Sequence, residues 1–159
     1  METDFSVFSC FFESCFLLLQ IILKIAIKDI HPEGIEVSDH IPVAAIGLTR
    51  DDPGYFIAPL NVQAKVSRAN NTVLAKTKVH GKYRSACARC LVEIERDWNG
   101  NFLFDFAVDK QTEVVELDED IRQHVLLNLP PRVLCKEDCK GICPQCGADL
   151  NNEECKCKQ

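Results

Sequence analysis

The sequence predicts an α+β fold, mainly an antiparallel β meander or open barrel, with one helix and a small zinc-binding tail at the C-terminus. Three observations support this prediction. Apolar and polar residues alternate over residues 62–67 and 72–85, one segment near residue 120 has helical periodicity, and six of the ten cysteines lie between residues 135 and 157. Alternation with a period of two indicates half-buried strands, whereas apolar residues spaced by four indicate one face of a helix.

The chain divides into three segments: an apolar extension at residues 1–22, a β-rich domain at residues 23–134, and a cysteine-rich tail at residues 135–159. Met1 is the only methionine and the patterned sequence starts near Leu23. We therefore expect translation to begin near Leu23, which would leave the extension outside the native protein.

The apolar extension lacks the features of an export or membrane segment. It begins with acidic rather than basic residues, unlike a signal peptide. Polar residues interrupt its apolar run, and a membrane-spanning helix needs about 20 apolar residues. We expect a cytoplasmic protein without membrane contact, whose thiols are reduced.

The strands follow in order along the β-rich domain. Residues 24–30 predict a short strand, and the prolines and glycines of residues 31–60 predict short or irregular ones. Asn70-Asn71 predicts a tight turn between a strand at residues 62–67 and a long one at residues 72–85. After a connection at residues 87–90, a third strand is expected at residues 91–98. Asn99-Gly100 then predicts a hairpin turn, followed by a fourth strand at residues 101–108.

A helix is predicted over residues 119–128. Ile121, Val125 and Leu129 are spaced by four, and Pro130 ends the pattern. Asp118 is the predicted N-cap, since a side-chain carboxylate there can accept hydrogen bonds from free backbone N–H groups.

The tail is too short to bury a core of its own, so a bound metal is expected to supply its folding energy. Structural zinc takes four tetrahedral ligands, and thiolates two residues apart reach one ion from a tight turn. The favoured ligands are Cys143, Cys146, Cys155 and Cys157. Cys135 and Cys139 are the alternative second pair. The alternatives to a zinc site are an iron–sulfur cluster, disulfide bonds and unpaired thiols.

Cys87 and Cys90 form a second Cys-x-x-Cys pair. They could complete the zinc site in three dimensions, act as a redox pair, or have a purely structural role. A thioredoxin-like pair should lie between a strand and a helix, whereas this one lies between two predicted strands. We therefore expect a non-enzymatic protein with no small-molecule substrate.

A basic strand is the candidate contact surface for RNA. Between Pro53 and Val92 the chain has seven basic and no acidic residues. Those on residues 72–85 occupy even positions, so they project from one face. Such a stripe would bind phosphates in a salt-dependent way. The predicted RNA-binding residues are Lys65, Arg68, Lys76, Lys78, Lys82, Arg84 and Arg89. The alternative is that the acids at positions 93, 95 and 97 pair with this strand and neutralise it.

Several of these features together resemble the YceD family of large ribosomal RNA subunit accumulation proteins. They are the Cys87-Ala-Arg-Cys90-Leu91 string, the acidic stretch and short helix ending at Leu129-Pro130, and the cysteine motif from Cys135 to Cys157. The resemblance covers roughly residues 23–157. It implies a bacterial cytoplasmic protein needed for normal levels of large-subunit ribosomal RNA, without established catalytic activity. Some family members lack the tail cysteines, which implies that the metal is a stabilising accessory and that Cys87 and Cys90 need not bind it.

The expected function is therefore a non-enzymatic role in the accumulation, processing or stability of large-subunit (23S) ribosomal RNA and in ribosome biogenesis. The expected partner is ribosomal RNA or a pre-ribosomal particle. In the alternative, a zinc-stabilised adaptor uses the acidic residues 113–120 and the tail to bind a ribosomal protein or an assembly factor. A thiol oxidoreductase acting through Cys87 and Cys90 is the third hypothesis.

Overall fold

Five antiparallel strands form the main sheet of the computed structural model, which describes residues 23–157. They are β2 (Ile35–Ile41), β3 (Gly54–Phe56), β4 (Leu60–Ala69), β5 (Thr72–Ala86) and β6 (Glu93–Ala107). β5 is central: β4 and then β3 pair along one of its edges, and β6 pairs along the whole of the other. The predicted, mainly antiparallel fold is confirmed as an open sheet. The expectation for residues 1–22 lies outside the described residues.

Smaller elements complete the fold. A second, two-stranded antiparallel sheet joins β1 (Lys24–Ala26) to β7 (Val114–Glu116). A 3-10 turn η2 (Ile27–Asp29) follows β1, so the strand predicted at residues 24–30 ends early. The helices are the short α1 (Val43–Ile46) and α2 (Asp118–Leu127), the latter close to the predicted residues 119–128.

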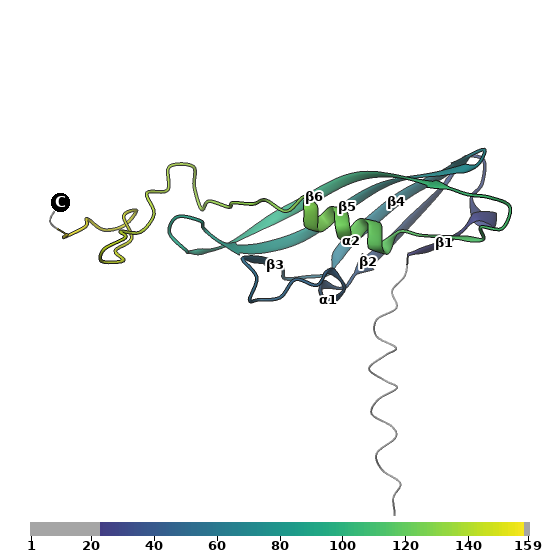
Figure 1. The fold of residues 1–159 in the computed structure, drawn as a ribbon. Coiled ribbons are helices and arrows are strands. Elements are labelled where there is room, and N and C mark those ends of the chain that lie inside the picture. Colours follow the sequence, from purple (N-terminus) through teal and green to yellow (C-terminus); the bar gives the residue numbers. More distant parts are fainter. Residues whose placement is uncertain (1–22, 158–159) are drawn as a thin grey trace, which may run out of the picture.

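The main sheet has a buried core face and an exposed outer face. On the core face, alternate residues of β4 and β5, such as Val62, Val66 and Val79, are almost fully buried. α2 runs along this part of the sheet (Figure 1) and buries Ile121 and Val125 completely. The intervening residues of β4, β5 and β6 project from the outer face of the sheet, and most of their side chains are exposed.

The predicted hairpin at Asn99-Gly100 is wrong. β6 continues through both residues and pairs with β5 without interruption from Glu93 to Ala107. Gly100 is needed there for another reason: a Cβ atom at this position would lie 2.5 Å from the Phe102 ring and 2.7 Å from Trp98. The glycine therefore makes room for aromatic side chains on the core face.

The predicted N-cap at Asp118 is also wrong. Leu117 occupies the cap position, and Asp118 is the first residue of α2. Both carboxylate oxygens of Asp118 accept a hydrogen bond from the backbone N–H of Leu23, at 2.9 Å. Burial raises the pKa of this carboxyl above its usual range, against the lowering effect of the Leu23 N–H. The side chain thus joins the start of α2 to the start of β1.

The tail follows α2 after a connection formed by residues 128–134. Figure 1 shows it extending from the end of the sheet at which β5 and β6 are connected. At the opposite end of β5, the predicted turn at Asn70-Asn71 is confirmed, and Asn70 has a φ of 53°. Within residues 23–157, no helix has the length and apolar character needed to cross a bilayer.

Candidate metal centre and basic sheet face

Eight cysteines of the described chain form two separate groups of four thiols. We call Cys87, Cys90, Cys135 and Cys139 the anchor cluster, and Cys143, Cys146, Cys155 and Cys157 the tail cluster. Within each cluster, all four sulfur atoms lie within 4.8 Å of one another. Each cluster therefore has the number and the spacing of ligands that a tetrahedral metal site requires.

The tail cluster contains the four cysteines that the sequence favours as zinc ligands. Its first pair lies on a tight turn, in which the Gly147 N–H donates to the Cys143 carbonyl oxygen at 2.9 Å. Gly147 has a φ of 74°, which glycine adopts at little cost. The Cys155 sulfur lies 3.2 Å from that of Cys143 and 3.7 Å from that of Cys146. The geometry thus groups the predicted residues, and metal binding by them stays a prediction.

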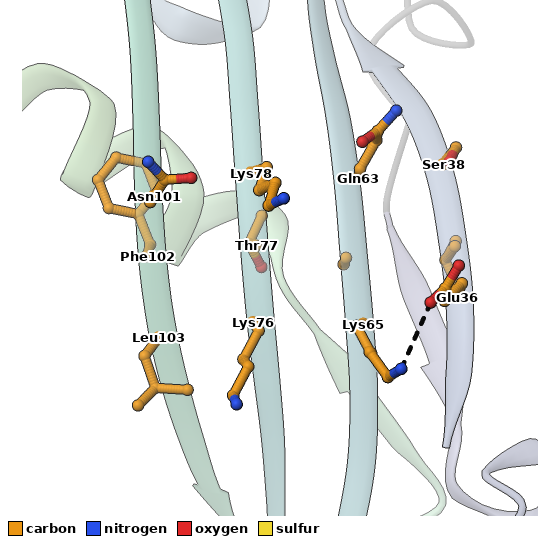
Figure 2. A pocket seen from close by; sticks show the side chains of 12 residues that line it. Glu36, Ser38, Gln63, Lys65, Lys76, Thr77, Lys78, Asn101, Phe102 and Leu103 are labelled. Atoms are coloured by element: carbon orange, nitrogen blue, oxygen red, sulfur yellow. Dashed lines mark ion pairs between the residues drawn. The ribbon is translucent and has the colours of Figure 1, made fainter. Parts of the chain in front are cut away.

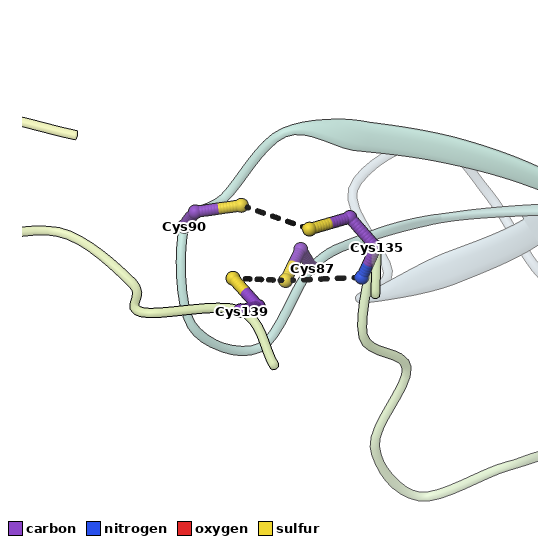
Figure 3. Close-up of side chains that lie close together, drawn as sticks. All are labelled: Cys87, Cys90, Cys135 and Cys139. Atoms are coloured by element: carbon purple, nitrogen blue, oxygen red, sulfur yellow. Dashed lines mark hydrogen bonds between the residues drawn. The ribbon is translucent and has the colours of Figure 1, made fainter. Parts of the chain in front are cut away.

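The anchor cluster joins two distant parts of the chain. Cys87 and Cys90 lie on the connection between β5 and β6, while Cys135 and Cys139 come from the chain after α2 (Figure 3). The sulfur of Cys87 is 3.8 Å from that of Cys139, and the sulfur of Cys90 is 3.6 Å from that of Cys135. The sequence suggested these residues only as alternatives for one site, because no local spacing shows that the two pairs meet.

The first cysteine of each cluster is poised to ionise. Desolvation acts to raise the pKa of Cys87, but hydrogen bonds from the backbone N–H groups of Cys90, Arg89 and Cys135 outweigh it and lower the pKa to about 6. The Cys146 N–H, followed by the Cys155 thiol, lowers the pKa of Cys143 to about 6 as well. The thiolate is the form that binds metal ions.

Crowding of sulfur atoms raises the pKa of one further thiol in each cluster. Burial and the neighbouring thiols raise the pKa of Cys135 to about 12, and the Cys146 and Cys155 thiols raise that of Cys157 to about 12. A cation at the centre of each cluster would remove this penalty by stabilising all four thiolates.

Both clusters fit zinc in their chemistry. Four sulfur atoms about 2.3 Å from one zinc ion lie about 3.8 Å from each other. The Cys87–Cys139 and Cys90–Cys135 separations in the anchor cluster, 3.8 and 3.6 Å, match this value. In the tail cluster the Cys146–Cys155 separation of 3.7 Å matches it and the Cys143–Cys155 separation of 3.2 Å is shorter. A disulfide bond is only about 2.05 Å long. Four thiolates leave no open coordination position, so such a site would be structural rather than catalytic. The same donors also suit an iron–sulfur cluster.

Three of the predicted RNA-binding residues lie together on the outer face of the main sheet. Lys65 and Lys76 are cross-strand neighbours on β4 and β5, and Lys78 follows on the same face (Figure 2). We call Lys65, Lys76 and Lys78 the lysine face. On β6, Lys76 is opposite Leu103 and Lys78 is opposite Asn101, so neither faces an acid there. Glu36 forms an ion pair with Lys65, 3.5 Å from its Nζ. Asp105 projects from the same face of β6, two residues beyond Leu103.

The lysine face lines a hollow of about 640 Å³. Neutral polar side chains lie beside the lysines on this face. The sequence did not single them out, because only charged residues were considered for RNA binding. Gln63, opposite Lys78, and Asn101 line the hollow. Asn99 lies further along β6, where its Oδ1 is 2.7 Å from the His80 Nδ1. All these side chains are exposed. The surface thus combines cations with hydrogen-bonding amides.

Three of the other four predicted RNA-binding residues have hydrogen-bond or ion-pair partners within the protein, and the fourth, Lys82, lies opposite an acid. Arg84 forms an ion pair with Glu95, and Lys82 is opposite Asp97 in the β5–β6 pairing. Arg68 donates to the Asn70 carbonyl oxygen at 3.1 Å, and Arg89 donates to that of Cys139 at 2.7 Å. The acids of β6 therefore neutralise the basic side chains near the C-terminal end of β5. The lysine face lies nearer the N-terminal end of the strand, opposite neutral residues of β6.

Comparisons with known proteins agree with the motif in the C-terminal part of the chain. Residues 104–159 match the family model described as large ribosomal RNA subunit accumulation protein YceD. Chloroplastic proteins named large ribosomal RNA subunit accumulation protein YCED homolog 1 are 31% identical over 61 residues in Arabidopsis thaliana and 35% identical over 63 residues in Zea mays. These alignments cover 38% and 39% of this chain, and 18% and 20% of the plant proteins.

Longer alignments are found with uncharacterized mycobacterial proteins. One from Mycobacterium bovis is 31% identical over 111 residues, and one from Mycobacterium leprae is 27% identical over 108 residues. They cover 60% and 58% of this chain, and the chain spans about half the length of these relatives, 54% and 50%. No solved structure matches the chain. The match to the family model over residues 104–159 and the YCED-named plant relatives show that this part of the chain is similar to the YceD family.

Proposed function

We propose that the protein is a non-enzymatic factor in the accumulation of large-subunit ribosomal RNA, and that it binds this RNA or a pre-ribosomal particle through the lysine face. In this proposal a zinc ion in the tail cluster orders the tail, and the protein acts in the bacterial cytoplasm. The observation that carries the proposal is the row of exposed lysines Lys65, Lys76 and Lys78 beside neutral amides. The name of the family supports the choice of RNA.

The chemistry of the outer face suits an RNA backbone. Lysine ammonium groups contact phosphates and release counterions, which gives affinity without sequence preference. Amide side chains can donate to and accept from sugar hydroxyls and base edges, which adds specificity. Successive residues on one face of a strand are about 6.8 Å apart, and neighbouring strands about 4.8 Å apart. A sheet face thus presents a grid of contacts rather than a single line.

Charge reversal tests the RNA contact. The double variant Lys76→Glu and Lys78→Glu is expected to weaken binding of a labelled large-subunit ribosomal RNA transcript by about 10- to 100-fold at moderate salt. It should also reduce the slope of log affinity against log salt by about 1.4, if the two lysines contact single-stranded phosphates. Filter binding at four salt concentrations would measure both quantities.

The matched control is Lys28→Glu with Lys110→Glu, which causes the same change in net charge. These exposed lysines lie on η2 and in the loop between β6 and β7, outside the lysine face. The control is expected to keep most of the affinity. If both double variants lose affinity equally, or if neither does, RNA binding by the lysine face is rejected.

Rejection would favour the adaptor, in which the acidic residues 113–120 and the tail bind a protein. The structure gives this alternative less support, because several of these acids have partners in the fold. Glu116 forms an ion pair with Lys24 at 2.8 Å, and Glu119 forms one with Arg122 at 2.8 Å. The oxidoreductase hypothesis also has less support, because Cys87 and Cys90 share a cluster with two further thiols.

A further inference from the structure

The tail cluster needs only one metal ion, yet the anchor cluster has all the features of a second site. We propose that the chain binds two zinc ions in separate four-thiolate sites, and that the ion in the anchor cluster attaches the tail to the end of the main sheet. This inference extends the metal part of the proposed function and is independent of RNA binding.

The two Cys-x-x-Cys turns have the same backbone structure. In each turn, the residue after the second cysteine donates its N–H to the carbonyl oxygen of the first: Leu91 to Cys87 at 3.0 Å, and Gly147 to Cys143 at 2.9 Å. Both of these residues have positive φ, 61° for Leu91 and 74° for Gly147. The turn that the sequence favours for zinc therefore has a structural duplicate between β5 and β6.

Leu91 shows that this conformation is imposed on the chain. A left-handed conformation is unfavourable for leucine, because its Cβ approaches the following carbonyl oxygen. Packing of the side chain does not explain the conformation, since Leu91 is 63% exposed. Such strain persists where the surroundings determine the backbone. The turn is closed by the Leu91 N–H bond to Cys87 and by the Cys87 N–H, which donates to the Val92 carbonyl oxygen at 2.8 Å. This closed turn places Cys87 and Cys90 beside Cys135 and Cys139.

The two clusters share no ligand. The anchor cluster takes its sulfurs from residues 87–139, and the tail cluster takes its sulfurs from residues 143–157. Each cysteine offers one sulfur atom, so eight cysteines complete two tetrahedral sites. A single site that used Cys135 and Cys139 with Cys143 and Cys146 would have to break both groups.

Backbone hydrogen bonds join the connection between β5 and β6 to the chain that follows α2. The Ala88 N–H donates to the Val133 carbonyl oxygen at 2.8 Å, and the Ile142 N–H donates to that of Arg89 at 3.2 Å. A Cβ atom at Gly141 would lie 3.0 Å from the Arg89 carbonyl oxygen, so the two segments are in close contact. The most buried side chains at this join are the thiols of Cys87 (0% exposed) and Cys139 (2% exposed). An ion between them would take the place of an apolar core.

Native mass spectrometry of the full chain loaded with zinc tests the stoichiometry. The wild-type protein is expected to hold two zinc ions. The double variant Cys90→Ser and Cys135→Ser is expected to hold one ion, and so is Cys146→Ser with Cys157→Ser. Ala88→Ser is the matched control, because it places a serine in the same turn without removing a thiol, and it should keep two ions.

Hydrogen exchange of the Ala88 amide tests the attachment and does not depend on counting ions. In the anchor variant this amide is expected to exchange at least about tenfold faster, because its bond to Val133 opens with the site. In the tail variant its exchange should be unchanged.

The two-ion proposal would be overturned if the wild-type protein held one ion and only the tail variant lost it. The tail site would then remain supported. One ion that only the anchor variant loses would instead reject the predicted tail site. Two ions with unchanged Ala88 exchange in the anchor variant would overturn the attachment.

Discussion

Removing zinc with a strong chelator is expected to unfold the tail, residues 135–157, while the main sheet stays folded. From residue 135 onward, the buried apolar side chains of the described chain are two cysteines, Cys139 and Cys143. Without metal this segment therefore has almost no apolar burial to offset its loss of conformational entropy. One structural zinc ion contributes on the order of 10 kcal/mol to folding at neutral pH. The main sheet instead has a hydrophobic core that includes Val62, Val66 and Val79.

Hydrogen exchange before and after chelation would measure this effect. The N–H groups of Cys143, Gly147 and Leu150 are hydrogen-bonded within the tail, and they should lose their protection. The N–H groups in the paired region of β5 and β6 should keep it. Adding Zn²⁺ back should restore protection, whereas Mg²⁺, which prefers oxygen ligands, should not. Equal protection of the tail amides with and without chelator would contradict a metal-dependent tail.

The difference between the tail and the sheet also explains what the sequence could predict. The strands at residues 60–69 and 72–86 were predicted closely, because one face of each is buried and the other exposed along its full length. Periodicity reports such one-sided burial directly. α2 was predicted for a similar reason, since Ile121 and Val125 face the core.

The hairpin at Asn99-Gly100 failed because a local rule was applied where a long-range interaction decides. Asn-Gly favours a tight turn in isolation. Here every residue from 93 to 107 pairs with β5, and a turn at Gly100 would break that ladder in its middle. The predicted N-cap at Asp118 failed for the same reason, because the hydrogen-bond partner of its side chain, the Leu23 N–H, is 95 residues away in the sequence.

The division of eight cysteines into two clusters could not be predicted from their spacing for the same physical reason. Cys143, Cys146, Cys155 and Cys157 are close in sequence, so their grouping was anticipated. Cys90 and Cys135 are separated by 45 residues, and their sulfurs meet only because the β5–β6 connection and the chain after α2 reach the same end of the sheet. The left-handed conformation of Leu91, which marks the first turn, leaves no signal in the sequence, because glycine is the residue expected there.

Replacing Phe56 with alanine is expected to cost the main sheet about 3 to 5 kcal/mol of its free energy of unfolding. Phe56 is 1% exposed, and its ring packs edge-on against Tyr83 and Trp98, with centroid separations of 5.3 and 5.6 Å. It belongs to β3, which has only three residues and pairs with the end of β5 nearest the anchor cluster. With so few backbone hydrogen bonds, β3 depends on this ring for its position.

The matched control is Tyr55→Ala on the same strand. Tyr55 is partly exposed and pairs opposite Arg84, so this substitution removes an aromatic ring from the other face of β3. Urea unfolding in buffer with zinc, followed by the fluorescence of the single tryptophan, would compare the two variants. Trp98 contacts the Phe56 ring, so its emission should also shift in the folded Phe56→Ala protein. A loss for Phe56→Ala no larger than that for Tyr55→Ala would mean that the β5–β6 ladder, and not the aromatic cluster, stabilises this end of the sheet.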